Sequence, residues 1–257
     1  MLALWWLDRW IRDASVVDVA WCLLFVIVVS GYAWFGAGEP FRRLLVAMMA
    51  AGYGLRLGIH VLYTRVLGRD EDPRYRRLRR EWGARASSYL LGYCLLQAGA
   101  LVLFSWPLLV VMQSPRPTLS GWEYVGILIW VVALVGETVA DLQLADFKRK
   151  LWNRERVCRD GLWYYSRHPN YFFEWLHWWS YVAMGIGLPN GTITWLGPLA
   201  MGWALLKVSG IPHAERQSLQ RLGDEYRRYQ RTTSRFIPWF PRRDFVHSNE
   251  QDPRGMP

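Results

Sequence analysis

The chain has 257 residues, of which 52% are hydrophobic and 20% charged, and its 31 Lys and Arg outnumber its 21 Asp and Glu. Disordered and collagen-like chains are excluded, because they lack this share of large apolar side chains. An ordinary soluble enzyme is excluded by the pattern, since the stretches 19–38, 86–115 and 175–206 contain no Asp, Glu, Lys or Arg. Apolar runs of about 18 residues or more predict membrane-spanning helices, which satisfy their own backbone hydrogen bonds in lipid.

Six membrane-spanning helices are predicted along the chain. Their ranges are 16–36, 44–63, 89–112, 122–142, 171–188 and 192–210. The two termini and alternate loops carry 26 Lys and Arg, whereas the other loops carry only Arg42, Arg43 and Arg116. Positively charged loops stay in the cytoplasm, so both termini are expected there. The predicted fold is an all-α, polytopic membrane helical bundle, with residues 1–243 as a single domain and 244–257 as a flexible tail.

The net charge of +10 follows this sidedness, so it indicates contact with membrane lipids and favours no nucleic-acid partner. Three cysteines without a CxxC pair predict neither a disulfide framework nor a thiolate metal site. The spacing Gly52-x-Gly54-x-x-x-Gly58 is not a nucleotide-binding fingerprint, and we expect these small residues to let helices pack closely. Residues 213–231 predict a helix on the membrane surface, interrupted at Gly223.

Ionisable side chains inside the spans are costly in lipid and are therefore candidates for function. Asp18 lies near the start of the first span, while Arg56 and His60 share one face of the second, with Tyr53 one turn before Arg56. The other residues of this kind are Glu137, Asp141, Glu174 and His177. All of these groups except Asp18 are expected near the cytoplasmic half of the bundle. They predict a polar cavity, open to the cytoplasm, that suits a ligand with one charged and one apolar end.

The densest set of polar side chains runs from Asp141 to His177. Its cations suit phosphate groups, and they are Lys148, Arg149, Arg154, Arg156 and Arg167. Its aromatic side chains suit stacking on a flat ring, and they are Trp163, Tyr164, Tyr165 and Tyr171. His168 and Asn170 provide hydrogen-bond donors. The chain has neither a GxGxxG unit nor a Walker loop, so nucleotide binding of those two kinds is excluded.

Several motifs resemble those of one membrane-protein family. They are Gly161-Leu-Trp-x-Tyr-Ser-Arg-His-Pro-Asn-Tyr171 with Glu174, Ser209-Gly-Ile-Pro followed by Glu215-Arg, Gly223-x-x-Tyr226-x-x-Tyr229, and Phe236-Ile-Pro238. In these the chain is similar to the DUF1295 membrane proteins, which belong with the steroid 5α-reductase C-terminal superfamily. The resemblance covers nearly the whole chain and implies a multi-helix membrane reductase with NADPH in a cytoplasm-facing site.

The resemblance also implies which residues act. The implied cofactor contacts are Asp141, Lys148, Tyr165, Arg167, His168, Asn170, Tyr171, Glu174, His213, Glu215 and Arg216. The family's Tyr and acid near the substrate carbonyl fall on Tyr53 and Asp18, the latter a shorter acid than the family's Glu. The expected reaction is conjugate reduction of a C=C bond in a lipophilic, steroid- or lipid-like substrate. Tyr53, assisted by Arg56 or His60, is expected to stabilise the developing oxygen charge or to donate the proton.

Two alternatives remain open. The RHPxY segment is also similar to that of isoprenylcysteine carboxyl methyltransferases, which would use S-adenosylmethionine. Asn170 and the cations at 148–156 favour the reductase, because cations suit the 2′-phosphate of NADPH. The third possibility is a non-catalytic lipid-binding membrane protein, which predicts no nucleotide binding.

Overall fold

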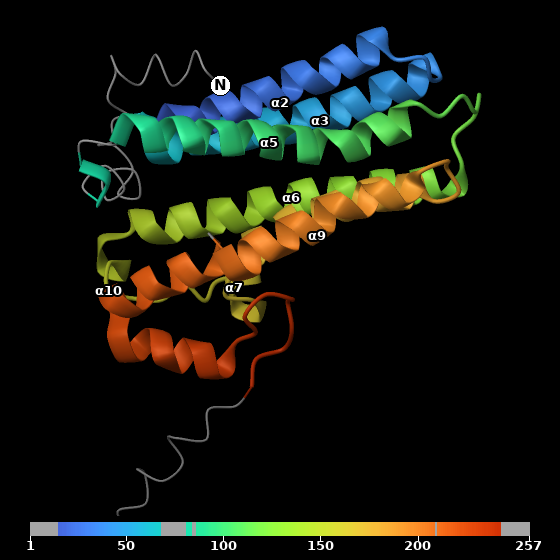
Figure 1. Ribbon diagram of the computed structural model, residues 1–257. Coiled ribbons are helices and arrows are strands. Elements are labelled where there is room, and N and C mark those ends of the chain that lie inside the picture. The colour runs from blue at the N-terminus through green and yellow to red at the C-terminus, as the bar shows by residue number, and fades with distance from the viewer. Residues whose placement is uncertain (1–14, 68–80, 84–85, 209, 243–257) are drawn as a thin grey trace, which may run out of the picture. The chain divides into compact units, whose positions relative to one another are not determined.

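The computed structural model describes residues 15–67, 81–83, 86–208 and 210–242 (Figure 1). The predicted tail at 244–257 lies outside the described residues. The described part is helical, and its β-structure is limited to one isolated bridge between Ser166 and Ser234. Its main helices are α2 (Ser15–Phe35), α3 (Pro40–Val61), α5 (Ala86–Met112), α6 (Gly121–Arg149), α7 (Leu162–Tyr165), α8 (Pro169–Gly185), α9 (Leu196–Trp203) and α10 (Ile211–Thr232). Shorter turns are η1 (Leu62–Val66), η3 (Leu151–Asn153), η4 (Gly191–Trp195) and η5 (Ala204–Val208).

Among the residues that the structure describes, four helices are long and apolar enough to cross a membrane. Their apolar parts are Val17–Phe35, Pro40–Thr64, Leu91–Met112 and Gly121–Arg149, so they confirm the first four predicted spans in length and composition. The fifth prediction falls on α8, which has 17 residues. The sixth falls on η4, α9 and η5, where no single helix is long enough. The total of six spans and the side on which the termini lie stay predictions.

The chain divides into two compact units. Unit 1 comprises Met1–Gly126 and Tyr181–Gly197, and unit 2 comprises Ile127–Ser180 and Pro198–Pro257. The expectation of a single domain at 1–243 stays a prediction.

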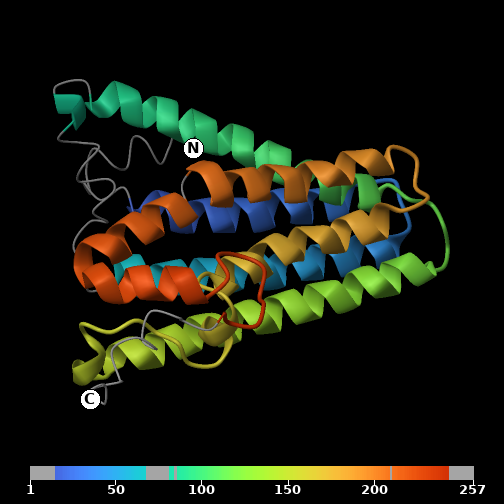
Figure 2. The same cartoon turned by 90° about the horizontal axis from the view of Figure 1, so that it is seen from below.

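In unit 1, α2 packs along both α3 and α5 (Figures 1 and 2). One face of α2, at Cys22, Phe25 and Val29, is completely or almost completely buried. Two glycines of α3 meet this face. A Cβ atom on Gly54 would lie 2.7 Å from Val26 Cγ2, and one on Gly58 would lie 3.3 Å from Cys22 Cβ. These glycines thus allow the close helix packing that their spacing predicts.

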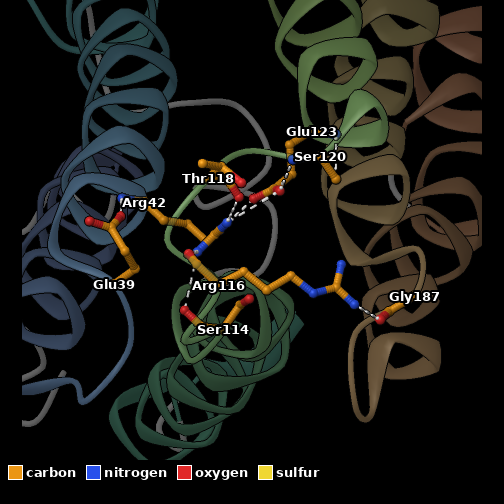
Figure 3. Close-up of polar contacts among 8 residues, drawn as sticks. All are labelled: Glu39, Arg42, Ser114, Arg116, Thr118, Ser120, Glu123 and Gly187. Atoms are coloured by element: carbon orange, nitrogen blue, oxygen red, sulfur yellow. Dashed lines mark hydrogen bonds and ion pairs between the residues drawn. The ribbon is translucent and has the colours of Figure 1, made fainter.

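Three arginines of unit 1 bind groups at its helix ends: Arg42 and Arg43 in the first turn of α3, and Arg116 between α5 and α6. Arg42 is fully buried and forms an ion pair with Glu123 of α6 (Figure 3). Its Nη1 also donates to the carbonyl of Arg116 at 2.7 Å, and its Nη2 donates to that of Thr118 at 2.9 Å. Since Ser120 and Glu123 cap the start of α6 reciprocally, the carboxylate that Arg42 binds is held in place.

Arg43 and Arg116 also bind carbonyl groups. Arg43 donates to the carbonyls of Ala33 and Trp34 at the end of α2. Arg116 donates to the carbonyl of Gly187 (Figure 3). The three basic residues that the charge pattern assigns to the sparsely charged loops therefore all serve as structural donors.

In unit 2, α8 runs antiparallel to α6. Asn170 near the start of α8 bonds to Asp141, whereas Phe173 lies against Gly136, one turn further back along α6. The second feature of unit 2 is the reversal of α10 at Gly223, whose φ of 51° favours glycine (Figure 1). A straight helix would separate residues 215 and 230 by about 22 Å. Instead, Gln230 Nε2 lies 3.2 Å from Glu215 Oε2.

Candidate functional site

The predicted cofactor motif begins on α6. Gly161, with a φ of 57°, precedes α7. Leu162 N donates to Gln143 Oε1 at 2.9 Å, and Trp163 Nε1 donates to the carbonyl of Ala140 at 2.9 Å. The positive φ of Gly161 strains any other residue at this position, and a Cβ atom there would also displace the Gln143 amide, whose Nε2 would lie 2.1 Å away. The motif therefore starts from a fixed position on α6.

Glu215 of α10 contacts two residues in the middle of the motif, Arg167 and His168. Arg167 Nη2 lies 2.7 Å from Glu215 Oε1, and His168 Nε2 lies 3.5 Å from the same oxygen. Arg235 Nε lies 4.0 Å from Oε2, the oxygen that also accepts from Gln230. We call these five residues the Glu215 cluster. It brings together three predicted cofactor residues that lie up to 48 positions apart in the chain.

Arg167 is the most heavily bonded member of the cluster. Its Nη1 donates to the carbonyls of Gln230 at 2.7 Å and Thr233 at 3.3 Å, and its backbone N donates to that of Ser234 at 2.9 Å. The residue is only 8% exposed. Its charge is balanced by Glu215 inside the protein, so Arg167 is suited to holding α10 and the segment after it in position.

The electrostatics of the cluster follow from its burial. Burial raises the pKa of the Glu215 carboxyl, but the neighbouring His168 ring and the charge of Arg167 outweigh it, so that this pKa lies below its usual value. Burial lowers the pKa of His168 more than Glu215 raises it. At neutral pH the cluster therefore holds a carboxylate and a neutral imidazole. The imidazole stacks on the ring of Tyr171, with centroids 5.5 Å apart.

A second polar contact joins the motif to α6. Asn170 Nδ2 donates to Asp141 Oδ1 at 3.1 Å, and Asn170 Oδ1 accepts from Tyr171 N at 3.0 Å. Asn170 and Asp141 are both half-buried, so a ligand can reach them. The two hydrogen bonds fix the orientation of the Asn170 amide.

The remaining predicted cofactor residues have varied surroundings. Lys148, Tyr165 and Arg216 are exposed, and Glu174 is buried. His213 is half-buried, and its Nε2 lies 3.0 Å from Gln217 Nε2. The structure thus unites Arg167, His168 and Glu215 in one cluster and Asp141 with Asn170 in one hydrogen bond. That the other predicted residues contact the same ligand stays a prediction.

The predicted catalytic residues all belong to unit 1. Tyr53 is 1% exposed, and its ring meets that of Phe25 edge to face at 6.1 Å. Asp18, Arg56 and His60 are half-buried. Since the predicted cofactor residues belong to unit 2, the meeting of the two sets at one site stays a prediction.

Comparison with known proteins identifies the family. The sequence pattern of the family described as "Protein of unknown function (DUF1295)" matches residues 4–233. The chain belongs to the DUF1295 family. An uncharacterized protein of Schizosaccharomyces pombe is 26% identical to it over 277 aligned residues, covering 95% of this chain and 77% of the yeast protein. No solved structure matches the chain.

Sequence reasoning missed part of the site of this DUF1295 chain. Gln230 and Arg235, which both contact Oε2 of Glu215, were not predicted. Ser166, also not predicted, donates from Oγ to the carbonyl of Phe236 at 2.8 Å and accepts from His168 N at 3.1 Å. The only sequence signal for these contacts is Gly223, because the reversal there returns the chain to the motif.

The side chains of the DUF1295 motif fit a dinucleotide by their chemistry. Exposed cations at the end of α6, Lys148 and Arg149, suit phosphate groups. The half-buried Asn170 and Asp141 provide a donor and acceptors for amide or ribose groups. Tyr165 is exposed and can stack on a flat ring. Arg167 fits a supporting role better than direct phosphate binding, because Glu215 already balances its charge.

Proposed function

We propose that this DUF1295 chain is a membrane-embedded reductase that uses NADPH to reduce a polarised C=C bond in a lipophilic, steroid- or lipid-like substrate. The observation that carries the proposal is the preorganised motif in unit 2. There Arg167 and His168 meet Glu215, while Asn170 is fixed on Asp141 beside the cationic end of α6. A buried cluster that orients half-buried polar side chains is the arrangement expected of a specific ligand site.

In this proposal the residues of the chain have separate tasks. Lys148 and Arg216 bind phosphate groups, and Asn170 with Asp141 orients the polar groups of the cofactor. NADPH, when bound, supplies the hydride. Tyr53, assisted by Arg56 or His60, donates a proton from its hydroxyl or stabilises the charge on the substrate oxygen. Burial of Tyr53 excludes water and strengthens that interaction.

The proposal includes a membrane orientation. Six spans with both termini inside would place the end of α6 and all of α10 on the cytoplasmic side, where the nucleotide is available. Support comes from the charge of the sequence, because 26 of the Lys and Arg lie in the termini and alternate loops. The lipophilic substrate would reach the protein from the surrounding membrane.

The direct test is nucleotide binding to the purified protein in detergent. NADPH, NADH and S-adenosylmethionine are titrated separately while the melting temperature is followed, since a ligand that binds only the folded state raises it. We expect the largest rise with NADPH. A selective rise with S-adenosylmethionine would replace the proposal by the methyltransferase, and no rise with any of the three would favour a non-catalytic lipid-binding protein.

One matched pair of variants locates the site. Asn170→Ala should weaken NADPH binding at least tenfold, because it removes the amide held by Asp141. Asn153→Ala is the control, since Asn153 also donates one amide hydrogen bond, to the carbonyl of Phe147 at 3.0 Å, but lies outside the motif. Equal NADPH affinity of the two variants would remove the motif from the binding site.

A further inference from the structure

Five large apolar side chains of unit 2 are exposed in one region. We call them the aromatic edge, and they are Tyr164, Tyr165, Ile237, Trp239 and Phe240. Trp239 and Phe240 are 70% and 74% exposed. Large apolar side chains exposed together, and not singly, indicate a surface that contacts another apolar phase.

The aromatic edge is attached to the motif by backbone contacts. Trp239 N donates to the carbonyl of Tyr165 at 2.9 Å, and the rings of Tyr165 and Phe240 meet at 5.8 Å. One residue further on, Ser166 Oγ donates to the carbonyl of Phe236. The exposed rings are therefore held in place by the same segment that carries Arg167.

The contacts of α7 with α6 define the depth of the aromatic edge along the membrane normal. Helix α6 has 29 residues, a length of about 43 Å, whereas the hydrocarbon core of a bilayer is about 30 Å thick. If the core begins near Trp122 at the capped start of α6, it ends about 20 residues later, near Asp141. Trp163 and Leu162 contact α6 at Ala140 and Gln143. With the core placed in this way, α7 would lie at the level of the interface between lipid and water.

Positive charges accompany the aromatic edge. Arg235 and Arg242 lie in the same C-terminal segment, and Arg231 lies in the last turn of α10; all three are exposed. Rings with a polar atom prefer the headgroup level, and guanidinium groups bind phosphate oxygens there. The combination matches an anionic lipid surface better than a second protein surface, which depletes charge at its centre.

We propose that the aromatic edge inserts into the headgroup layer of the leaflet in which α6 ends, with Arg231, Arg235 and Arg242 on anionic phospholipid headgroups. The membrane surface then fixes the segment 233–242, and through it the backbone around Ser166 and Arg167. This inference rests on the membrane location of the chain and is independent of the reductase proposal.

The test measures the depth of a single fluorophore in lipid nanodiscs. Phe240→Cys is labelled with an environment-sensitive dye, which is selective because Cys22, Cys94 and Cys158 are buried. Lipids with a nitroxide on the shallow part of the acyl chain act as quenchers. The matched control is Asp224→Cys, an exposed position at the reversal of α10.

We expect several-fold stronger quenching at residue 240 than at residue 224, and stronger quenching in phosphatidylglycerol than in phosphatidylcholine. Equal quenching at the two positions would overturn the proposal. It is the result expected if a second copy of the chain, or residues 243–257, covered the aromatic edge in place of lipid. Equal quenching in the two lipids would overturn the anionic assignment. Ile237→Cys provides a second label if Phe240→Cys does not fold, and NADPH plays no part in the readout.

Discussion

Gly136 sets how closely α6 and α8 approach each other. A Cβ atom there would lie 2.4 Å from Cε1 of the Phe173 ring, well inside contact distance, and the stiff ring cannot bend aside. We expect Gly136→Ala to lower the free energy of unfolding by about 1–3 kcal/mol, the usual effect of overpacking. Thermal unfolding in detergent measures this.

The control for this change is Gly31→Ala in α2, where an added Cβ meets nothing within 4 Å. Alanine has the higher helix propensity, so this variant should be as stable as the wild type or more stable. If Gly136→Ala were equally harmless, the contact between Gly136 and Phe173 would not hold α6 against α8.

The buried pair of His168 and Glu215 makes stability depend on pH. Burial lowers the pKa of His168 in the folded protein below 6.5, its ordinary value, which applies to the unfolded chain. As the pH falls through 6.5, the unfolded chain therefore binds more protons than the folded protein, and the free energy of unfolding decreases. The lowered pKa of Glu215 gives the same sign at more acidic pH, because its carboxylate must be protonated as the cluster is lost. The melting temperature should therefore decrease from pH 7.5 to 5.5.

His168→Gln should show a smaller decrease over this pH range, since it removes the group that titrates. The control is His213→Gln. His213 is a half-buried histidine of α10 that contacts Gln217 and lies outside the Glu215 cluster. It should keep the pH dependence of the wild type. The same decrease in all three proteins would mean that His168 is accessible to protons in the folded state.

At the scale of whole elements, the pair of Arg42 and Glu123 ties the start of α3 to the start of α6 in unit 1. Removing one member of a buried ion pair leaves the other charge without its counter-charge, so Arg42→Leu should cost about 3–5 kcal/mol of unfolding free energy. The double variant Arg42→Leu with Glu123→Leu should cost clearly less than the sum of the single variants. Denaturant unfolding of the four proteins gives this coupling.

The nearby Arg116 provides the control for this cycle. It is exposed and donates to the carbonyl of Gly187, so Arg116→Ala should cost less than about 1.5 kcal/mol. Additive effects of Arg42→Leu and Glu123→Leu would show that the carbonyl contacts of Arg42, and not the ion pair, provide the stability.

The apolar runs were sufficient to predict α2, α3, α5 and α6, because a long apolar helix needs no partner to specify it. They were not sufficient for the run at 175–206. Gly187 and Asn190, with φ values of 74° and 58°, lie in the turn between α8 and η4, where the sequence predicts the break between the fifth and sixth spans. The length of an apolar run does not reveal that the part after this turn is divided into η4, α9 and η5.

The candidate site was predictable to a similar extent. Residue types identified Arg167, His168 and Asn170 as a polar set, and the family resemblance added Glu215. Their partners were not predictable, because Arg167 is bound by carbonyls of Gln230 and Thr233, and a carbonyl leaves no signal in a sequence. Only the reversal at Gly223 brings these carbonyls to the motif.

For the whole molecule, the number of membrane spans depends on whether α8 and the segment after it cross the membrane. In unit 2, α8 runs antiparallel to α6, as a fifth span must. In unit 1, Gly187, which follows α8, is bound by Arg116, which precedes α6. We therefore expect Thr192, after α8, to be on the same side as Thr118, before α6, and opposite to Asp146 near the end of α6.

Exposed single-cysteine variants at positions 118, 146, 192 and 224 test this arrangement with a membrane-impermeant thiol reagent. In intact cells, the variants at 118 and 192 should react, and those at 146 and 224 should react only after the membrane is opened, because six spans place them inside. A chain in which α8 and α9 do not cross would instead place residue 192 with residue 146. Labelling at 192 that follows 146 would thus reduce the count to four spans, while labelling at 224 outside would contradict a cytoplasmic α10 and the nucleotide site proposed there.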